Sequence, residues 1–179
     1  SGKPTVYIPD RIDEGYGPNV EAMSRLAQNH QLIICVDCGT LSHGPIEAAI
    51  AAGAKVMIAD HHLAGETLPV CDAVVNPNRH DDDSGMGALC AAGVVFLLLI
   101  AANRLRREAG EMAPNLISML DLVALATVAD VAQLTGLNRA LVRQGLKVMA
   151  GRQRPGLKAL ADVAGVNSHP NAFHLGYLL

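Results

Sequence analysis

The chain has 179 residues, half of them hydrophobic and only five of them aromatic (three Tyr and two Phe). A chain of this length and hydrophobicity can bury an aliphatic core, which excludes an intrinsically disordered protein. Seventeen acidic and fourteen basic residues give a formal net charge of −3. This balance excludes a globally basic nucleic-acid binder but leaves room for a local basic patch.

No membrane-spanning segment is expected. The longest apolar stretch is residues 88–102, and it is shorter than the about 20 residues that a membrane span needs. The first four residues do not resemble a signal peptide. Four cysteines do not make a disulfide scaffold in a chain of this size, so a reducing, cytoplasmic environment is expected.

The first half of the chain alternates short apolar runs with helical patterns. Gly53 follows one of the helical patterns and is expected to stop that helix. Strands joined by helices favour right-handed crossovers and a parallel sheet covered on both faces. We predict strands over residues 5–8, 32–36, 55–59 and 73–75, and helices over residues 20–30 and 42–52.

The second half contains only helical patterns, and a polar loop over residues 78–87 separates it from the first half. The expected fold class is therefore α/β: a parallel sheet with flanking helices in residues 1–87, followed by an all-helical segment in residues 88–179. We predict helices over residues 88–109, 115–129, 138–150, 156–164 and 171–178.

Two predicted strands end in residues that commonly bind metals. The second strand leads into Asp37, and the third leads into the triplet Asp60-His61-His62. Ligands bind at the carboxyl edge of such sheets, and neighbouring strands lie about 4.8 Å apart, so both strand ends could hold one metal ion. In a random sequence of this composition the triplet is expected only about 0.02 times.

The two histidines are expected to have different roles. Adjacent side chains on an extended segment point in opposite directions, so one histidine would bind the metal and the other would face the substrate. An alternative stays open for the aspartates: Asp37 could cap the helix that begins near Ser42, and Asp60 could cap whatever follows the third strand.

Cys35 and Cys38 form a C-x-x-C pattern across the end of the second strand. Because positions three apart on a strand face opposite sides, one zinc ion could not easily bind both. Small buried thiols are therefore favoured over a metal or redox pair.

Residues 131–161 carry six basic residues and no acidic one, which leaves eight basic against seventeen acidic residues elsewhere. Arg139, Arg143 and Lys147 repeat every four residues, so they share one face of a helix. Such a basic stripe can follow a phosphate backbone, although a solvated helix face explains it equally well.

Several segments resemble the DHH phosphoesterase superfamily and, within it, the family of RecJ-type exonucleases, which degrade single-stranded DNA from the 5′ end. The resemblance covers nearly the whole chain in register. The Asp-His-His triplet alone indicates the superfamily, whereas residues 11–17 and 121–130 indicate the RecJ type. The matching segments are residues 6–11, 14–17, 36–39, 59–62, 75–77, 91–96 and 120–131.

The resemblance implies a role for each residue that matches a family motif. Asp37 would bridge two metal ions, His61 would bind one of them, and Asp130 would complete a metal shell. His62, with Asp60 beside it, would be catalytic and would face the phosphate.

The resemblance also implies contacts with nucleic acid. Arg11 would contact phosphate and Tyr16 would stack on a base, although Arg11 could instead pair with a neighbouring carboxylate. Asp121 is a second candidate for the role of Asp130. A helix-terminal charge or a paired core carboxylate is the favoured interpretation of Asp121.

The implied reaction is two-metal hydrolysis of phosphodiester bonds with Mn²⁺ or Mg²⁺ as cofactor. Single-stranded DNA would be the substrate, and a single-strand-binding protein and a helicase would be protein partners. One alternative is a DHH phosphoesterase that acts on short oligonucleotides, cyclic dinucleotides or pyrophosphate. The other is a catalytically silent DHH-like scaffold that binds nucleic acid or a partner protein.

The sequence departs from the family pattern at both ends. The family's first motif, Asp-x-Asp, is expected before residue 5, and a substrate-binding domain is expected after residue 179. Residues 1–87 would then be the C-terminal part of the sheet region and residues 88–179 the helical part of a DHH catalytic domain. Because two ions need a complete ligand set, the chain alone is expected to be inactive.

Overall fold

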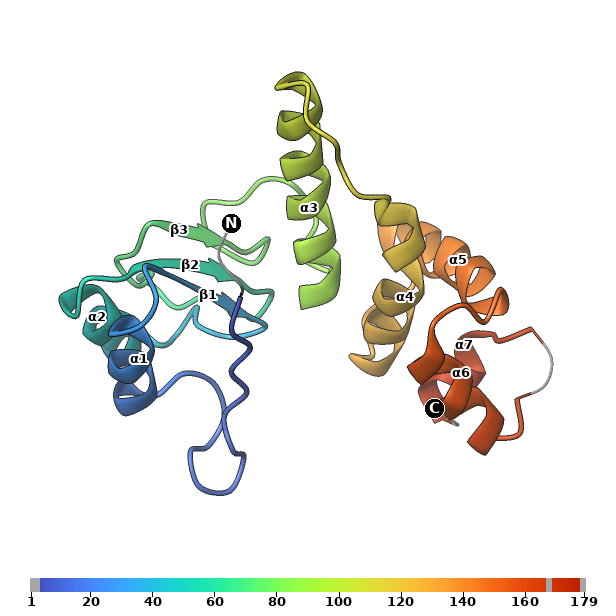
Figure 1. The fold of residues 1–179 in the computed structure, drawn as a ribbon, viewed down its shortest axis with the longest axis horizontal. Coiled ribbons are helices and arrows are strands. Elements are labelled where there is room, and N and C mark those ends of the chain that lie inside the picture. The colour runs from blue at the N-terminus through green and yellow to red at the C-terminus, as the bar shows by residue number, and fades with distance from the viewer. Residues whose placement is uncertain (1–3, 167–168, 178–179) are drawn as a thin grey trace. The chain divides into compact units, whose positions relative to one another are not determined.

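The structure, a computed structural model, describes residues 4–166 and 169–177 of the chain. It divides into two compact units, Ser1–Asp82 and Asp83–Leu179 (Figure 1). Within the described residues, the first unit holds every strand and two helices, and the second unit holds only helices. The predicted fold class, a parallel α/β sheet with flanking helices followed by a helical segment, is therefore confirmed.

The sheet of the first unit has three parallel strands. They are β1 (Leu32–Val36), β2 (Lys55–Ala59) and β3 (Ala73–Val75), and they lie in this order with the predicted bounds. The register pairs the last residue of each strand with the last residue of its neighbour. The residues that follow the three strands therefore come out at one common edge of the sheet.

One helix precedes β1 and another follows it. Helix α1 (Val20–Ala27) is capped by Asn19, the residue before it, whose side chain accepts a hydrogen bond from the N–H of Ala22 at 2.8 Å. Helix α2 (His43–Ala51) is followed by Gly53, whose φ of 95° is a conformation that glycine adopts at low cost. The predicted helix stop at Gly53 is therefore confirmed.

Helices α1 and α2 both pack on the same face of the sheet (Figure 1). The opposite face of β1 carries Leu32, Ile34 and Val36, which are about half exposed. The predicted cover on both faces is therefore wrong for this unit as far as it is described. The reason is that α2 is the one helix of this unit that joins two strands among the described residues, since β2 and β3 follow each other without a helix between them.

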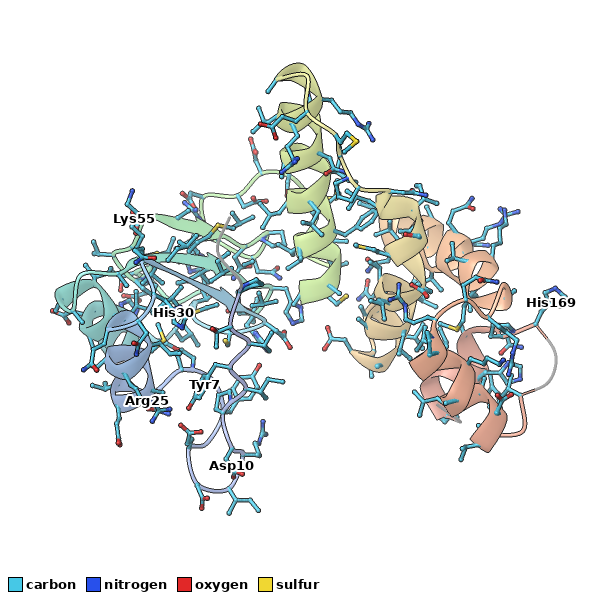
Figure 2. All side chains as sticks on the ribbon, in the orientation of Figure 1. Tyr7, Asp10, Arg25, His30, Lys55 and His169 are labelled. Atoms are coloured by element: carbon cyan, nitrogen blue, oxygen red, sulfur yellow. The ribbon has the colours of Figure 1, made fainter. Side chains whose placement is uncertain are left out.

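Residues 5–8 do not form the predicted strand. Val6 and Ile8 are 83% and 81% exposed, so this apolar pattern meets no core. Tyr7 is held instead by Arg25 of α1, whose guanidinium lies 5.5 Å from the ring centroid and donates to the hydroxyl at 3.3 Å (Figure 2). The run is only four residues long and lies between two prolines, which cannot donate to a strand ladder.

The second unit is helical, as predicted, and its helices lie close to the predicted bounds. The last residue of the predicted helix 171–178 lies outside the described residues. None of the helices among the described residues is both long and apolar enough to span a bilayer. The helices are α3 (Ala91–Glu108), the 3₁₀ helix η1 (Leu116–Met119), α4 (Leu120–Ala129), α5 (Gly136–Ala150), α6 (Pro155–Val163) and α7 (Ala172–Tyr177).

The closest helix packing in this unit is between α4 and α5, and it depends on Gly145. A Cβ atom at Gly145 would lie 2.1 Å from the carbonyl oxygen of Leu120 and 2.5 Å from the Cβ of Ala124. Only glycine therefore lets the two helices approach to this distance. The surrounding core contains Ala124, Val142, Met149, Leu157 and Leu175.

Gly145→Ala is expected to lower the free energy of unfolding by about 1–3 kcal/mol, because a backbone carbonyl has to move aside for the added methyl group. Gly156→Ala in α6 is the matched control, since a Cβ there meets nothing within 4 Å. Alanine is favoured over glycine in a helix, so this variant is expected to be neutral or more stable by up to about 1 kcal/mol. Urea unfolding compares the two, and equal stabilities would contradict the close packing of α4 on α5.

Candidate metal site

The carboxyl edge of the sheet gathers the polar residues that follow the strands. Asp37 follows β1, Asp60 and His61 follow β2, and Asn76 follows β3. The hydrogen-bond ladder continues one residue beyond the strands. The N–H of Asp37 donates to the carbonyl oxygen of Ala59, and the N–H of Asp60 donates to that of Val75, both at 3.0 Å. The three loops are thus held at hydrogen-bonding distance from one another where they leave the sheet.

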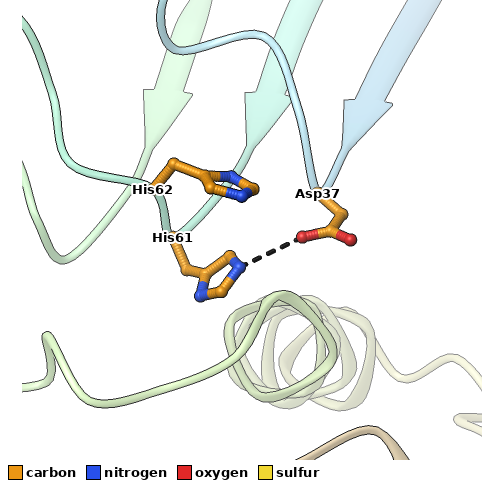
Figure 3. Close-up of side chains that lie close together, drawn as sticks. All are labelled: Asp37, His61 and His62. Carbon is orange, nitrogen blue, oxygen red and sulfur yellow. Dashed lines mark ion pairs between the residues drawn. The ribbon is translucent and has the colours of Figure 1, made fainter. Parts of the chain in front are cut away.

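Asp37, His61 and His62 form a cluster of possible metal ligands at this edge (Figure 3). Their ligand atoms all lie within 4.8 Å of one another, and His61 Nε2 is 3.1 Å from Asp37 Oδ1. The carboxylate is a ligand that Mn²⁺ and Mg²⁺ prefer, and the imidazole nitrogens are ligands of divalent transition-metal ions in general. The residues present therefore fit a metal of this class.

The two histidine rings lie side by side, with their centroids 4.6 Å apart (Figure 3). The prediction that adjacent side chains point in opposite directions is therefore wrong at this place. It assumed an extended backbone, but β2 ends at Ala59 and the chain turns at His61 and His62. The turn allows both imidazoles to face the same space as the Asp37 carboxylate.

Asp37 adopts a left-handed backbone conformation with a φ of 62°. Gly39 follows with a φ of 111°, and a Cβ there would lie 3.2 Å from side-chain atoms of Cys35 and Ile58. This tight turn directs the Asp37 side chain toward His61. The alternative interpretation of Asp37 as a helix cap is wrong, because Ser42 is the N-cap residue of α2.

Asp60 is only 1% exposed, and its carboxylate accepts several hydrogen bonds. Oδ1 accepts the N–H groups of His61 and His62 at 2.8 and 3.3 Å and lies 2.7 Å from His62 Nδ1, and Oδ2 accepts the N–H of Thr40 at 3.0 Å. Burial by itself would raise the pKa of Asp60, but the hydrogen bonds from Thr40, His62 and the backbone lower it to about 2. Asp60 is therefore an ionised internal anchor for the turn, and it does cap the segment after β2.

Arg11 and Tyr16 lie beside this cluster. The guanidinium carbon of Arg11 is 5.0 Å from the ring centroid of Tyr16, and the Tyr16 ring meets the His62 ring edge-on at 6.1 Å. The Tyr16 hydroxyl donates to the carbonyl oxygen of Asp37 at 2.8 Å. Burial and the Asp37 carboxylate raise the pKa of Tyr16, which keeps this hydroxyl a donor. A cation and an exposed aromatic ring thus adjoin the cluster of possible metal ligands.

Asp121 and Asp130 both belong to the second unit and differ in their surroundings. Asp121 is 4% exposed, and Nε and Nη2 of Arg154 donate to its two carboxylate oxygens at 2.8 and 3.0 Å. The interpretation of Asp121 as a paired core carboxylate is therefore confirmed. Asp130 is exposed and forms the C-cap of α4.

The predicted basic stripe of Arg139, Arg143 and Lys147 lies on α5, and all three side chains are exposed. The opposite side of this helix packs on α4 and buries Leu141, Val142, Gly145 and Met149. The predicted single helix face is therefore confirmed, while its role stays a prediction.

The thiols of Cys35 and Cys38 do not face opposite sides as predicted, because the chain turns at the intervening Asp37. A hydrogen bond between the two thiols, together with burial, raises the pKa of Cys35, and the same bond lowers the pKa of Cys38. The Cys38 thiol also donates to the carbonyl oxygen of Val36 at 3.4 Å. Cysteine is not part of any possible metal cluster among the described residues. The favoured interpretation of Cys35 as a buried thiol is confirmed.

Sequence reasoning missed Thr40, Asn76 and Asn78, which contact Asp60 or the two histidines. The one available signal was a pair of asparagines directly after an apolar strand, at the edge where the predicted site lies. Their partners are distant in sequence, so the pattern alone indicated a turn and nothing more.

The family model described as "DHH family, N-terminal domain" matches residues 2–127. The single-stranded-DNA-specific exonuclease RecJ of Escherichia coli (strain K12) is 41% identical over 181 residues, and that of Thermus thermophilus is 36% identical over 162 residues. These alignments cover 96% and 89% of this chain but only 31% and 23% of the relatives.

Two solved structures resemble this one. A RecJ exonuclease bound to manganese has a TM-score of 0.80 at 34% identity, over 96% of this chain and 42% of that one. RecJ from Thermus thermophilus in complex with Mn²⁺ has a TM-score of 0.73 at 32% identity, over 89% of this chain and 23% of that one. The chain spans a third or less of the length of the curated relatives it matches. Since the family model matches more than half of its residues, the chain belongs to the DHH family.

Proposed function

We propose that this chain carries part of the catalytic core of a RecJ-like exonuclease, which degrades single-stranded DNA in the 5′→3′ direction with Mn²⁺ or Mg²⁺ as cofactor. The observation that carries the proposal is the convergence of Asp37, His61 and His62 at the carboxyl edge of a parallel sheet. Two similar solved structures, one of RecJ bound to manganese and one of RecJ in complex with Mn²⁺, support the choice of metal.

In this proposal Asp37 and His61 would hold the metal, and Asp37 would be shared between two ions. Asp130 supplies a further carboxylate, whereas Asp121 does not, because both of its oxygens are held by Arg154. Two bound divalent ions would lower the pKa of a water molecule and stabilise the charge that develops on the phosphoryl oxygens.

His62 faces the phosphate in this proposal, and Asp60 acts through it. The short contact between Asp60 and His62 Nδ1 fixes the ring and leaves Nε2 directed away from the buried carboxylate. His62 is 45% exposed at its side chain, whereas that of Asp60 is 2% exposed. His62 can therefore touch a substrate, and Asp60 is a positioning residue.

Residues 1–87 would form the C-terminal part of the sheet region of a DHH catalytic domain, and residues 88–179 would form its helical part. Asp37, His61 and Asp130 would be part of a two-ion ligand set that further carboxylates and water molecules would complete. The 179 residues alone are therefore expected to be inactive.

Single-stranded DNA would contact two surfaces. Arg11 and Tyr16 beside the metal ligands would hold a phosphate and stack on a base, and the exposed stripe on α5 would follow the backbone. The proposed enzyme acts in the cytoplasm, where a helicase and a single-strand-binding protein would present the unpaired strand.

Asp37→Asn and His61→Gln in the complete protein are each expected to lower the rate more than 100-fold and to weaken Mn²⁺ binding, because loss of even an outer partner of a ligand costs about 10–100-fold. His62→Ala is expected to lower the rate about 10²–10³-fold while Mn²⁺ affinity stays close to that of the wild type. The rate is measured on single strands labelled at the 5′ or the 3′ end, and Mn²⁺ affinity by titration.

His30→Gln is the control for these variants, because His30 lies just before β1, at the opposite end of the strand from Asp37 (Figure 2). Wild-type rates in Asp37→Asn and His61→Gln would overturn the metal assignment. Cleavage restricted to short oligonucleotides or cyclic dinucleotides would favour another DHH phosphoesterase, and binding without cleavage would favour a scaffold.

Replacing Arg139, Arg143 and Lys147 together by glutamine is expected to weaken binding of single-stranded DNA. The slope of log K against log salt should become shallower by about 2, since each lost phosphate contact on a single strand accounts for about 0.7. Fluorescence anisotropy of a labelled oligonucleotide over a series of salt concentrations measures the slope.

The matched control replaces Lys55, Arg107 and Lys158, three exposed cations that are spread over β2, α3 and α6. With glutamine at these three positions the variant loses the same charge but keeps Arg139, Arg143 and Lys147. Its slope of log K against log salt should therefore stay close to that of the wild type. Equal slopes in the two triple variants would show that α5 is merely a solvated face.

A further inference from the structure

Side chains bond to both the N–H groups and the carbonyl oxygens of the His61 and His62 backbone. The two N–H groups donate to Asp60, as described above. The carbonyl oxygen of His61 accepts from Asn78 Nδ2 at 2.6 Å, and that of His62 accepts from Asn76 Nδ2 at 2.8 Å. The peptide groups that carry both imidazoles thus have side-chain partners on each side.

Asn76 is the centre of this second set of contacts. It is 2% exposed, its Oδ1 accepts the N–H of Asn78 at 2.8 Å, and its Nδ2 donates to Thr40 Oγ1 at 2.9 Å as well as to His62. Thr40 in turn donates its N–H to Asp60. The contacts form a closed ring that joins the loops after β1, β2 and β3.

Beyond the end of the sheet, the side-chain amides of Asn76 and Asn78 take the place of the backbone donors of the strand ladder. The last ladder bond between β2 and β3 runs from the N–H of Asp60 to the carbonyl of Val75 at 3.0 Å. Beyond it the chain turns, and the amides of Asn76 and Asn78 bond to the carbonyls in place of a backbone donor. The turn can therefore leave the plane of the sheet, which brings both rings to one side, without unsatisfied carbonyls.

The position of Asn78 indicates that its side chain orients the His61 peptide group, in addition to satisfying a carbonyl oxygen. Asn78 is only half-buried, and its Nδ2 nonetheless donates to the carbonyl oxygen of His61 at 2.6 Å. Its short bond goes to His61, whose ring lies 3.1 Å from Asp37. A bond at this place orients the peptide group next to the proposed metal ligand, and outer partners of this kind determine how well a ligand is presented.

We propose that Asn76 and Asn78 are positioning residues for the metal site: Asn78 orients His61 toward the ion, and Asn76 orients His62 toward the phosphate. This inference rests on the proposed function, because it requires His61 to bind a metal. It adds two residues from the loop after β3 to a site whose ligands come from the loops after β1 and β2.

The test uses Asn78, because replacing the buried Asn76 could simply prevent folding. Asn78→Ala removes the donor, and Asn78→Leu removes it while keeping a side chain of similar size. In the complete protein, the Mn²⁺ concentration for half-maximal rate on a 5′-labelled single strand is expected to rise about 10–100-fold in both variants. The rate at saturating Mn²⁺ should recover to near the wild-type value, with melting temperatures without metal within about 3 °C of the wild type.

Asn29→Ala is the matched control, because Asn29 also donates from its side chain to a backbone carbonyl, at the exposed end of α1. It should leave the Mn²⁺ dependence unchanged. A half-saturating Mn²⁺ concentration within twofold of the wild type in both Asn78 variants would overturn the inference. A loss of rate that Mn²⁺ does not restore, with a lower melting temperature, would also overturn it, since Asn78 would then be merely structural.

Asp37→Asn in the same assay separates this inference from the proposed function. If Asp37→Asn raises the half-saturating concentration and the Asn78 variants do not, the metal site stands and only the positioning role is wrong. If none of these variants changes it, the metal site itself is wrong.

Discussion

The candidate site depends on one interaction, the hydrogen bonding of the buried Asp60 carboxylate. A carboxylate in a residue that is only 1% exposed is costly to keep charged unless hydrogen-bond donors surround it. The Asp60 carboxylate is contacted by three backbone N–H groups and by the imidazole of His62. These donors lower its pKa to about 2, so it stays an acceptor at any physiological pH. Because its partners are the backbone of the His61–His62 turn, the charge sets the direction of both rings.

The sheet supplies the second constraint. Parallel strands that end level deliver Asp37, Asp60 and Asn76 to one edge, although they are far apart along the chain. The left-handed turn at Asp37 then directs its carboxylate toward His61. The possible ligand atoms from two adjacent loops lie within 4.8 Å of one another, which is close enough for one ion to contact all of them.

The second unit contains one buried, paired carboxylate and several exposed charged side chains. Asp121 is buried and paired with Arg154, so it stabilises the packing around α4 and is not available to an ion. Asp130, at the other end of the same helix, is exposed, as are the cations of α5. Glycine at position 145 lets α5 approach α4 closely, which leaves the basic face of α5 turned away from this contact.

The sequence by itself determined the strands and helices, the parallel sheet and the residue types at the strand ends, because apolar periodicity and turn residues are local signals. It was wrong for residues 5–8, where an apolar pattern between two prolines meets no partner strand, and for the directions of His61, His62 and the Cys35–Cys38 pair. Only the tertiary structure decided these directions, since they follow from turns that distant residues hold. Thr40 and Asn76 contact Asp60 and His62 across 20 and 14 positions of sequence, and no local pattern encodes such contacts.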